Sequence, residues 1–216
     1  MGTGGLAGTG LDDPALDPVY SALESAGQTI FLHPHYGLPS EVFGPRAAEY
    51  GHVLPLALGF PLETTIAISR MFLSGVFDRF PRLTVLLAPP LPFLAGRLES
   101  CIMHDAHYSA GRNRRDVWEV LKTNILLDAV VYSELGIKAA VAASGTDRVM
   151  FGTDHPFFPP LEGDEDSQQA SKWPSMTMNY EAIRGAFGAE DKLVDAVLGG
   201  NAVRLLRLAT DSETTS

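Results

Sequence analysis

The sequence predicts an α/β fold with about four parallel strands, and three observations lead to this prediction. Short apolar runs at residues 29–32, 83–87, 125–128 and 149–151 alternate with helical stretches, as in parallel sheets whose strands are joined by helices. A chain of 216 residues, 45% of them apolar, is long enough to bury a sizeable core. Four strands fit either a small open sheet or half of an eight-stranded barrel. His33 and Asp154 each follow the carboxyl end of a strand, where barrel enzymes carry their chemistry, and this favours the barrel.

The first half of the chain is predicted to contain two helix-then-strand units. Asp17 is expected to cap a helix that has Pro18 in its first turn, and this helix leads into the strand at residues 29–32. A long apolar helix is expected from about Leu62 to Phe80, followed by the strand at 83–87 and a helical stretch at 91–104.

Two further units are predicted in the second half. Helices around residues 117–121 and after Ser133 precede the strands at 125–128 and 149–151. A polar, proline-rich loop is expected at 157–174, then helices at about 177–187 and 193–208, the last one interrupted by Gly199 and Gly200. We expect one domain over residues 1–208 and a disordered tail at 209–216.

Composition and charge restrict the possible partners and location. With 26 acidic and 16 basic residues the formal net charge is −10, which disfavours binding to a phosphate backbone. The single cysteine, Cys101, can form neither an internal disulfide nor a cysteine zinc site. We see no secretory signal at the amino terminus and no apolar run of the length of a membrane span. The expected location is the cytosol, with no nucleic-acid or membrane partner.

The first candidate functional residue is His33, directly after the strand at 29–32. An imidazole at this position can point into a barrel mouth and bind a divalent metal ion through one nitrogen. From position alone, a hydrogen-bonded structural histidine is the commoner case. Tyr36 could line the same mouth or merely pack.

The second candidate is Asp154, in the segment Phe151-Gly152-Thr153-Asp154-His155. An apolar strand ends at a glycine and presents a carboxylate at once. This carboxylate could cap a helix, bind a metal ion or transfer a proton.

A rival site is offered by His104, Asp105 and His107, because residues three apart on a helix share a face. These residues lie close to Arg112, Arg114 and Arg115. That setting is typical of a solvated surface segment, so metal binding here is the weaker interpretation.

Six segments, taken together and in order, resemble the decarboxylase branch of the amidohydrolase superfamily, typified by aminocarboxymuconate-semialdehyde decarboxylase and isoorotate (uracil-5-carboxylate) decarboxylase. They are residues 11–20, 31–35, 59–65, 91–100, 151–157 and 200–202. The Thr-Asp-His-Pro-Phe-Phe run at 153–158 resembles the isoorotate-type enzymes most. The resemblance implies the carboxyl-terminal half of a TIM-type (β/α)8 barrel and a carboxy-lyase that releases carbon dioxide from a small planar carboxylate.

The resemblance also implies roles for individual residues. His33 would be a metal ligand, and Asp154 would be both a metal ligand and the proton donor to the carbon that loses carbon dioxide. Phe157 would line the substrate pocket. Arg97 would reach across a homodimer interface toward the substrate carboxylate, although a plain surface arginine fits its position as well. The implied cofactor is a divalent metal ion, zinc in the first place and manganese as the alternative.

Two departures from the family pattern shape our expectations of activity. The family opens with a strand that carries a paired ligand motif, and the sequence here starts after that point; a full barrel needs roughly 250 residues or more. In addition, Ala88 runs into Pro89 where the family has a histidine and glycines. We therefore expect the chain alone to hold little zinc and to be inactive on isoorotate, and a version with both stretches restored to regain both.

Two alternatives to the decarboxylase stay open on the sequence. One is a non-catalytic remnant that pairs with a full-length subunit. The other is a metal-dependent hydrolase of the same superfamily, since metal-bound hydroxide opens lactones and amides as well. Metal content tests the first alternative, and carbon dioxide release against ring opening tests the second.

Overall fold

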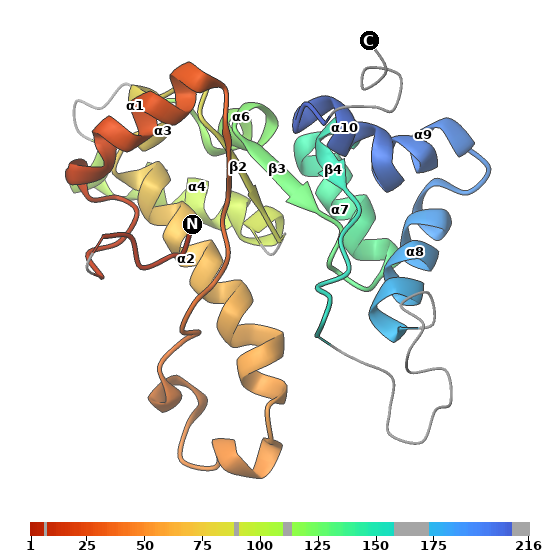
Figure 1. Ribbon diagram of the computed structural model, residues 1–216. Coiled ribbons are helices and arrows are strands. Elements are labelled where there is room, and N and C mark those ends of the chain that lie inside the picture. Colours follow the sequence, from red (N-terminus) through yellow and green to blue (C-terminus); the bar gives the residue numbers. More distant parts are fainter. Residues whose placement is uncertain (7, 89–90, 110–113, 158–172, 209–216) are drawn as a thin grey trace. The chain divides into compact units, whose positions relative to one another are not determined.

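The computed structural model describes residues 1–6, 8–88, 91–109, 114–157 and 173–208 (Figure 1). The chain divides into two compact units, Met1–Ile125 and Leu126–Ser216. Three predictions fall outside the described residues: the missing histidine near Pro89, the disordered tail at 209–216, and most of the loop expected at 157–174.

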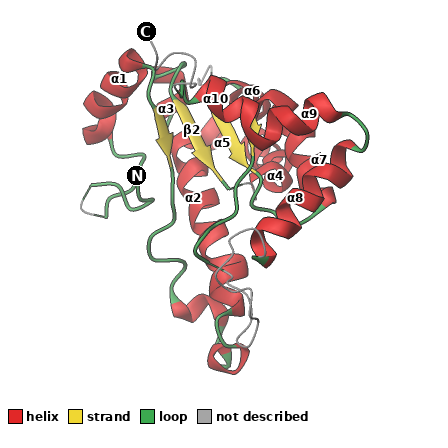
Figure 2. Ribbon diagram, turned by 45° about the vertical axis from the view of Figure 1, so that its right-hand side comes forward, coloured by secondary structure: helices red, strands yellow, loops and turns green. Residues whose placement is uncertain are grey.

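The first unit alternates helices with two short strands. Its elements are η1 (Pro14–Leu16), α1 (Asp17–Ala26), β1 (Thr29–Phe31), η2 (Ser40–Phe43), η3 (Ala47–Tyr50), the π-helical η4 (Pro55–Gly59), α2 (Phe60–Leu73), α3 (Val76–Arg79), β2 (Thr84–Leu87), α4 (Leu91–His104), α5 (Ala106–Ser109) and α6 (Val117–Thr123). The segments η2, η3 and η4 extend beyond the strands at the amino-terminal end of α2 (Figure 2).

The core of the first unit forms because β1 and β2 are apolar and run in parallel. Ile30 pairs with Val85, and both are buried. In β2 the burial is continuous from Val85 to Leu87, which is typical of parallel strands covered by helices, whereas in β1 Phe31 is 55% exposed. Helix α2 contributes Ile68 and Met71, which are 2% and 1% exposed, and α1 contributes Tyr20, whose hydroxyl donates to the Leu11 carbonyl oxygen at 2.6 Å.

The second unit repeats the alternation around another parallel pair. Its elements are β3 (Ile125–Asp128), which starts at the last residue of the first unit, α7 (Glu134–Ser144), η5 (Thr146–Arg148), β4 (Val149–Met150), α8 (Pro174–Phe187), α9 (Asp191–Asp195), the π-helical η7 (Ala196–Gly200) and α10 (Asn201–Leu205). Leu127 pairs with Val149 in parallel, and both are fully buried. The helix predicted after Ser133 is present as α7, and Ser133 caps it, its hydroxyl accepting from the Gly136 amide at 3.0 Å.

The predicted α/β class and all four predicted strands are confirmed, with strand ends within one or two residues. The predicted cap at Asp17 is wrong. Asp13 accepts from the Ala15 amide at 2.9 Å and starts a 3-10 turn, which runs directly into α1. Asp17 is therefore already helical, and its carboxylate pairs with Arg79 at 2.9 Å.

The single helix predicted from Leu62 to Phe80 is also wrong, because the helical segment ends before Gly75. This glycine has a φ of 80°, a left-handed conformation that ends a helix. At the other end, π-helical and α-helical turns continue over Pro55–Leu73, which is long and apolar enough by length and composition to cross a membrane. The prediction that the chain has no apolar run of the length of a membrane span is therefore wrong for Pro55–Leu73. Core helices pass the same test, and α2 has six buried residues.

Candidate functional site

His33 lies at the carboxyl end of β1, as predicted, and its side chain is exposed. Its backbone N–H donates to the Met1 carbonyl oxygen at 3.0 Å, in an isolated parallel bridge with Gly2. Its ring Nδ1 lies 2.6 Å from the Pro34 carbonyl oxygen, and because a carbonyl oxygen only accepts, this hydrogen bond requires the tautomer with the proton on Nδ1. The lone pair on Nε2 is then left for a metal ion, in the arrangement that ligating histidines usually adopt.

Asp154 follows β4 and is exposed. It caps no helix; its carbonyl oxygen accepts from the Phe157 amide at 2.8 Å in a turn, so one of the three roles left open by the sequence is excluded. Its φ is 58°, which is rare for a residue with a side chain, and conformations of this kind are concentrated at functional sites.

Tyr132 follows β3 in the second unit, and the negative charge of Asp154 acts on its hydroxyl. Burial, together with the negative charges of Asp154 and Asp128, raises the pKa of its hydroxyl to about 12. Its own φ is 53°. No sequence pattern indicated Tyr132, because a tyrosine in an apolar run is usually a packing residue.

Asn179 on α8 connects the segments that follow β3 and β4. It is fully buried. Its side-chain oxygen accepts from the Tyr132 amide at 2.8 Å, and its side-chain nitrogen donates to the Gly152 carbonyl oxygen at 3.1 Å. Because Gly152 is two residues before Asp154, this one amide restrains the backbone on which Asp154 is presented.

We expect Asn179→Ala to lower the free energy of unfolding by about 2–4 kcal/mol, since each buried group left without its partner costs roughly 1–3 kcal/mol. Urea denaturation followed by circular dichroism measures the loss. The control is Thr177→Ala at an exposed position of the same helix, which should stay within about 0.5 kcal/mol of the wild type. A loss below 1 kcal/mol for Asn179→Ala would show that the two bonds do not hold these segments.

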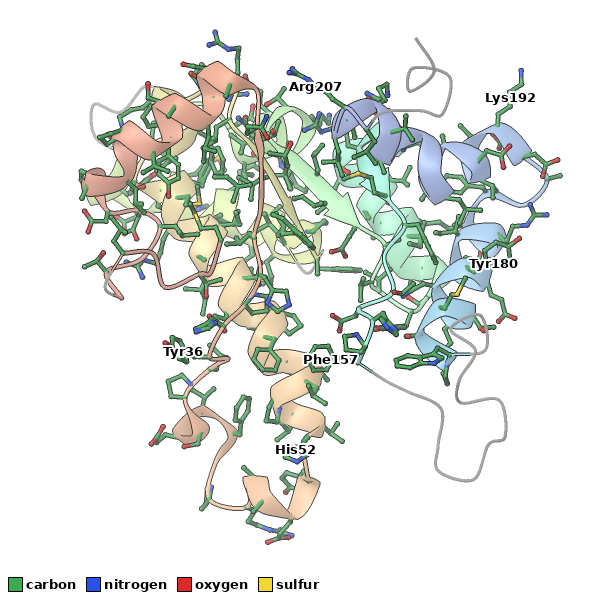
Figure 3. All side chains as sticks on the ribbon, viewed as in Figure 1. Tyr36, His52, Phe157, Tyr180, Lys192 and Arg207 are labelled. Atoms are coloured by element: carbon green, nitrogen blue, oxygen red, sulfur yellow. The ribbon has the colours of Figure 1, made fainter. Side chains whose placement is uncertain are left out.

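Phe157 and Arg97 are both exposed. Phe157 is 51% exposed, at the end of the described segment that carries Asp154 (Figure 3). Arg97 lies on α4, whose buried residues are Leu91 and Ala95. Neither position tests the roles that the family resemblance implies, so these roles stay predictions.

The rival site does not form a metal cluster in the described part of the chain. Asp105 accepts from the Tyr108 amide at 2.9 Å at the start of α5, and His104 Nδ1 lies 2.7 Å from the Ser100 carbonyl oxygen. Among the described residues no group of three or more His, Cys, Asp or Glu side chains is arranged to hold an ion. The side chain of His107, the third member of the predicted rival site, lies outside what the structure describes.

The candidate metal donors belong to different units. His33 is in the first unit and Asp154 in the second, so their sharing of one ion stays a prediction. Two neighbouring histidines could add donors. The His35 ring lies edge-on to Tyr36 with centroids 4.2 Å apart, and the His155 ring lies 4.3 Å from the Trp173 ring.

Comparison with known proteins gives related decarboxylases. A family model described as amidohydrolase matches residues 6–208, which include parts of both units. The 2-amino-3-carboxymuconate-6-semialdehyde decarboxylase of Dictyostelium discoideum is 34% identical over 154 residues, 69% of this chain and 41% of that protein. The apo crystal structure of Metarhizium anisopliae IDCase is 57% identical, with a TM-score of 0.89 over 96% of this chain and 55% of that one.

A third relative shows the fold alone. It is the manganese-bound 5-carboxyvanillate decarboxylase of Novosphingobium aromaticivorans, with 24% identity, a TM-score of 0.70, and coverage of 92% of this chain and 53% of that one. The chain thus spans about half the length of these relatives. Their agreement confirms the predicted fold class, part of a TIM-type (β/α)8 barrel.

Proposed function

Because this chain belongs to the amidohydrolase family, we propose that it carries the His33 and Asp154 part of the metal centre of a non-oxidative decarboxylase. The substrate class is a small planar carboxylate, with isoorotate as the first candidate. The 57% identity to IDCase and the relatives that are named decarboxylases support this choice. The observation that carries the metal role is the His33 ring, whose Nδ1 contact with Pro34 leaves Nε2 as a ligand.

The donors present fit a divalent metal ion, since one imidazole and one carboxylate are both common zinc and manganese ligands. When bound, such an ion would supply positive charge that holds and polarises the substrate oxygens. The manganese in the 5-carboxyvanillate decarboxylase supports the choice of a divalent cation. We propose zinc as the first candidate and manganese as the second.

Asp154 has the role of proton donor in the proposed reaction. As the bond between the ring carbon and the carboxylate breaks, the electron pair stays on the carbon and carbon dioxide leaves. The Asp154 carboxyl gives its proton to that carbon, and water restores the proton afterwards. The exposed position of Asp154 leaves it accessible to a ligand.

Phe157 and Arg97 complete the proposal. The exposed ring of Phe157, three residues after Asp154, offers a flat apolar surface on which a planar substrate can stack. We propose that Arg97 pairs with the substrate carboxylate across a homodimer interface, since a guanidinium matches a carboxylate with two parallel hydrogen bonds. The expected location is the cytosol, and the exposed free thiol of Cys101 fits a reducing compartment.

The experiment that tests the function measures the two products expected from isoorotate, carbon dioxide and uracil. The chain is incubated with isoorotate and millimolar Mn²⁺ or Zn²⁺, and trapped carbon dioxide is measured together with uracil by liquid chromatography. Equal amounts of both, formed only when metal is present, are expected from a version in which the amino-terminal ligand stretch and the histidine-glycine stretch near Pro89 are restored, and neither product is expected from the chain alone. A ring-opened product without carbon dioxide would identify a hydrolase instead. If the restored version forms neither product at saturating metal, the decarboxylase assignment fails and the non-catalytic partner takes its place.

A further inference from the structure

Glu63, near the start of α2, accepts three hydrogen bonds in the first unit. Its carboxylate accepts from the Thr3 hydroxyl, from the His35 backbone N–H at 3.2 Å and from the Gly37 backbone N–H at 2.5 Å. Its side chain is half-buried. The three donors come from two segments that are far apart in the sequence, and one carboxylate joins them.

The bonds to His35 and Gly37 fix the segment that directly follows His33. This segment buries little of its own surface: His33 and His35 are exposed, and the Tyr36 side chain is 82% exposed (Figure 3). Gly37 has a φ of 69° and lies against Phe60 of α2, whose ring carbon would be only 3.3 Å from an added Cβ. Hydrogen bonds to a charged acceptor are stronger than neutral ones. The path of this segment therefore depends on Glu63 more than on packing of its own side chains.

The bond from Thr3 fixes the backbone on the other side of His33. Thr3 follows Gly2, which forms the parallel bridge with His33, and the His33 amide donates to the Met1 carbonyl oxygen. Glu63 thus restrains both the strand-like segment beside His33 and the loop after it.

An ordinary ion pair does not explain Glu63. Within the described ranges no Lys, Arg or His nitrogen forms a salt bridge with its carboxylate. The nearest basic residue along α2 is Arg70, two turns further, and it pairs with Asp12 at 2.6 Å and donates to the Thr9 carbonyl oxygen at 2.8 Å. The Glu63 carboxylate accepts only from neutral N–H and O–H groups among the described residues, as an anchor for backbone does.

We propose that Glu63 is a positioning residue that holds the backbone on both sides of His33 and so directs its imidazole toward the metal ion. This inference rests on the proposed function, in which His33 binds metal. Sequence reasoning gave Glu63 no role, because it lies 30 residues from His33 on a helix and its partners are mostly backbone groups.

The first measurement needs no metal. Hydrogen exchange of the full chain, resolved to single amides by NMR, is compared between the wild type and Glu63→Gln, which keeps the shape but loses the charge and one acceptor. We expect exchange at His35 and Gly37 to become about tenfold faster or more. Glu49→Gln is the matched control, since Glu49 is exposed and pairs with Arg46, and it should leave both amides unchanged. Unchanged exchange in Glu63→Gln overturns the proposal.

The second measurement is Mn²⁺ affinity by electron paramagnetic resonance. Loss of groups that orient a ligand typically costs about 10–100-fold in metal affinity, and we expect Glu63→Gln to fall in that range. In a His33→Ala background, Glu63→Gln should cause no further loss, because Glu63 acts through His33. A purely structural role would weaken binding equally in both backgrounds and would overturn the proposal.

Different results would overturn the metal role of His33 and the positioning role of Glu63. If His33→Ala binds Mn²⁺ as tightly as the wild type, the metal role of His33 is overturned and the positioning role with it. If His33→Ala weakens binding and Glu63→Gln does not, only the positioning role is overturned. Should Glu63→Gln fail to fold, Thr3→Val removes one of the three bonds and is expected to give a smaller change in the same direction in both measurements.

Discussion

The chain purified without added metal is expected to contain far less than one equivalent of zinc or manganese and to release no measurable carbon dioxide from isoorotate. Protein zinc sites use three or four protein ligands, whereas His33 and Asp154 are the two donors that we assign. Elemental analysis by mass spectrometry and a carbon dioxide assay measure both quantities. Addition of millimolar Mn²⁺ or Zn²⁺ is expected to give the product in the version with both missing stretches restored, and not in the chain alone.

A control variant distinguishes the site of His33 and Asp154 from the rival site at His104. His104→Ala is expected to leave Mn²⁺ binding unchanged, because the His104 ring is engaged with the Ser100 carbonyl oxygen on α4. A chain that is fully metallated and active as purified would show that our count of donors is wrong. If His104→Ala loses Mn²⁺ binding, the metal site lies on α4 and not at His33 and Asp154.

The second large effect is expected from Asp154→Asn, introduced into the version with both missing stretches restored, at saturating metal. Asparagine keeps the shape of the side chain but cannot donate a carboxylic proton, and proton transfer by a positioned acid contributes about 10²–10⁴-fold to a rate. We therefore expect carbon dioxide release to fall at least about a hundredfold. Mn²⁺ affinity is expected to fall as well, because an amide oxygen is a weaker ligand than a carboxylate.

The matched control is Asp195→Asn on α9, an exposed carboxylate in the same unit with the same change of charge. It should keep wild-type release. Thermal unfolding of both variants shows whether a loss of activity reflects unfolding. If Asp154→Asn retains more than a tenth of the wild-type rate at saturating metal, Asp154 is not the proton donor.

The strands could be predicted closely because they are short apolar runs with polar residues at their ends. Ile125–Asp128 and the helix Leu91–His104 agree with the structure at both ends. The same signal placed His33 and Asp154 at strand ends, since the position of a residue along a strand is a local property.

The errors arose where local signals compete or where none exists. Asp13 and Asp17 both suit a helix start, and only the structure shows that Asp13 accepts the capping bond. Gly75 could have stayed within a helix, but its left-handed conformation ends one. The bonds of Asn179 and Glu63 join residues that are 26 to 60 positions apart, so no pattern along the sequence could indicate them.

Two side chains of helix α2 hold two separate parts of the first unit in place. Glu63 binds residues 3, 35 and 37, and Arg70, two turns along the same helix, binds Asp12 and the carbonyl oxygen of Thr9. In chimeras made with a related decarboxylase that has other residues at positions 63 and 70, exchange of α2 alone would break both sets of bonds at once. A recombination boundary that keeps residues 1–12, the loop after β1 and α2 from one parent is therefore the one expected to give a folded protein.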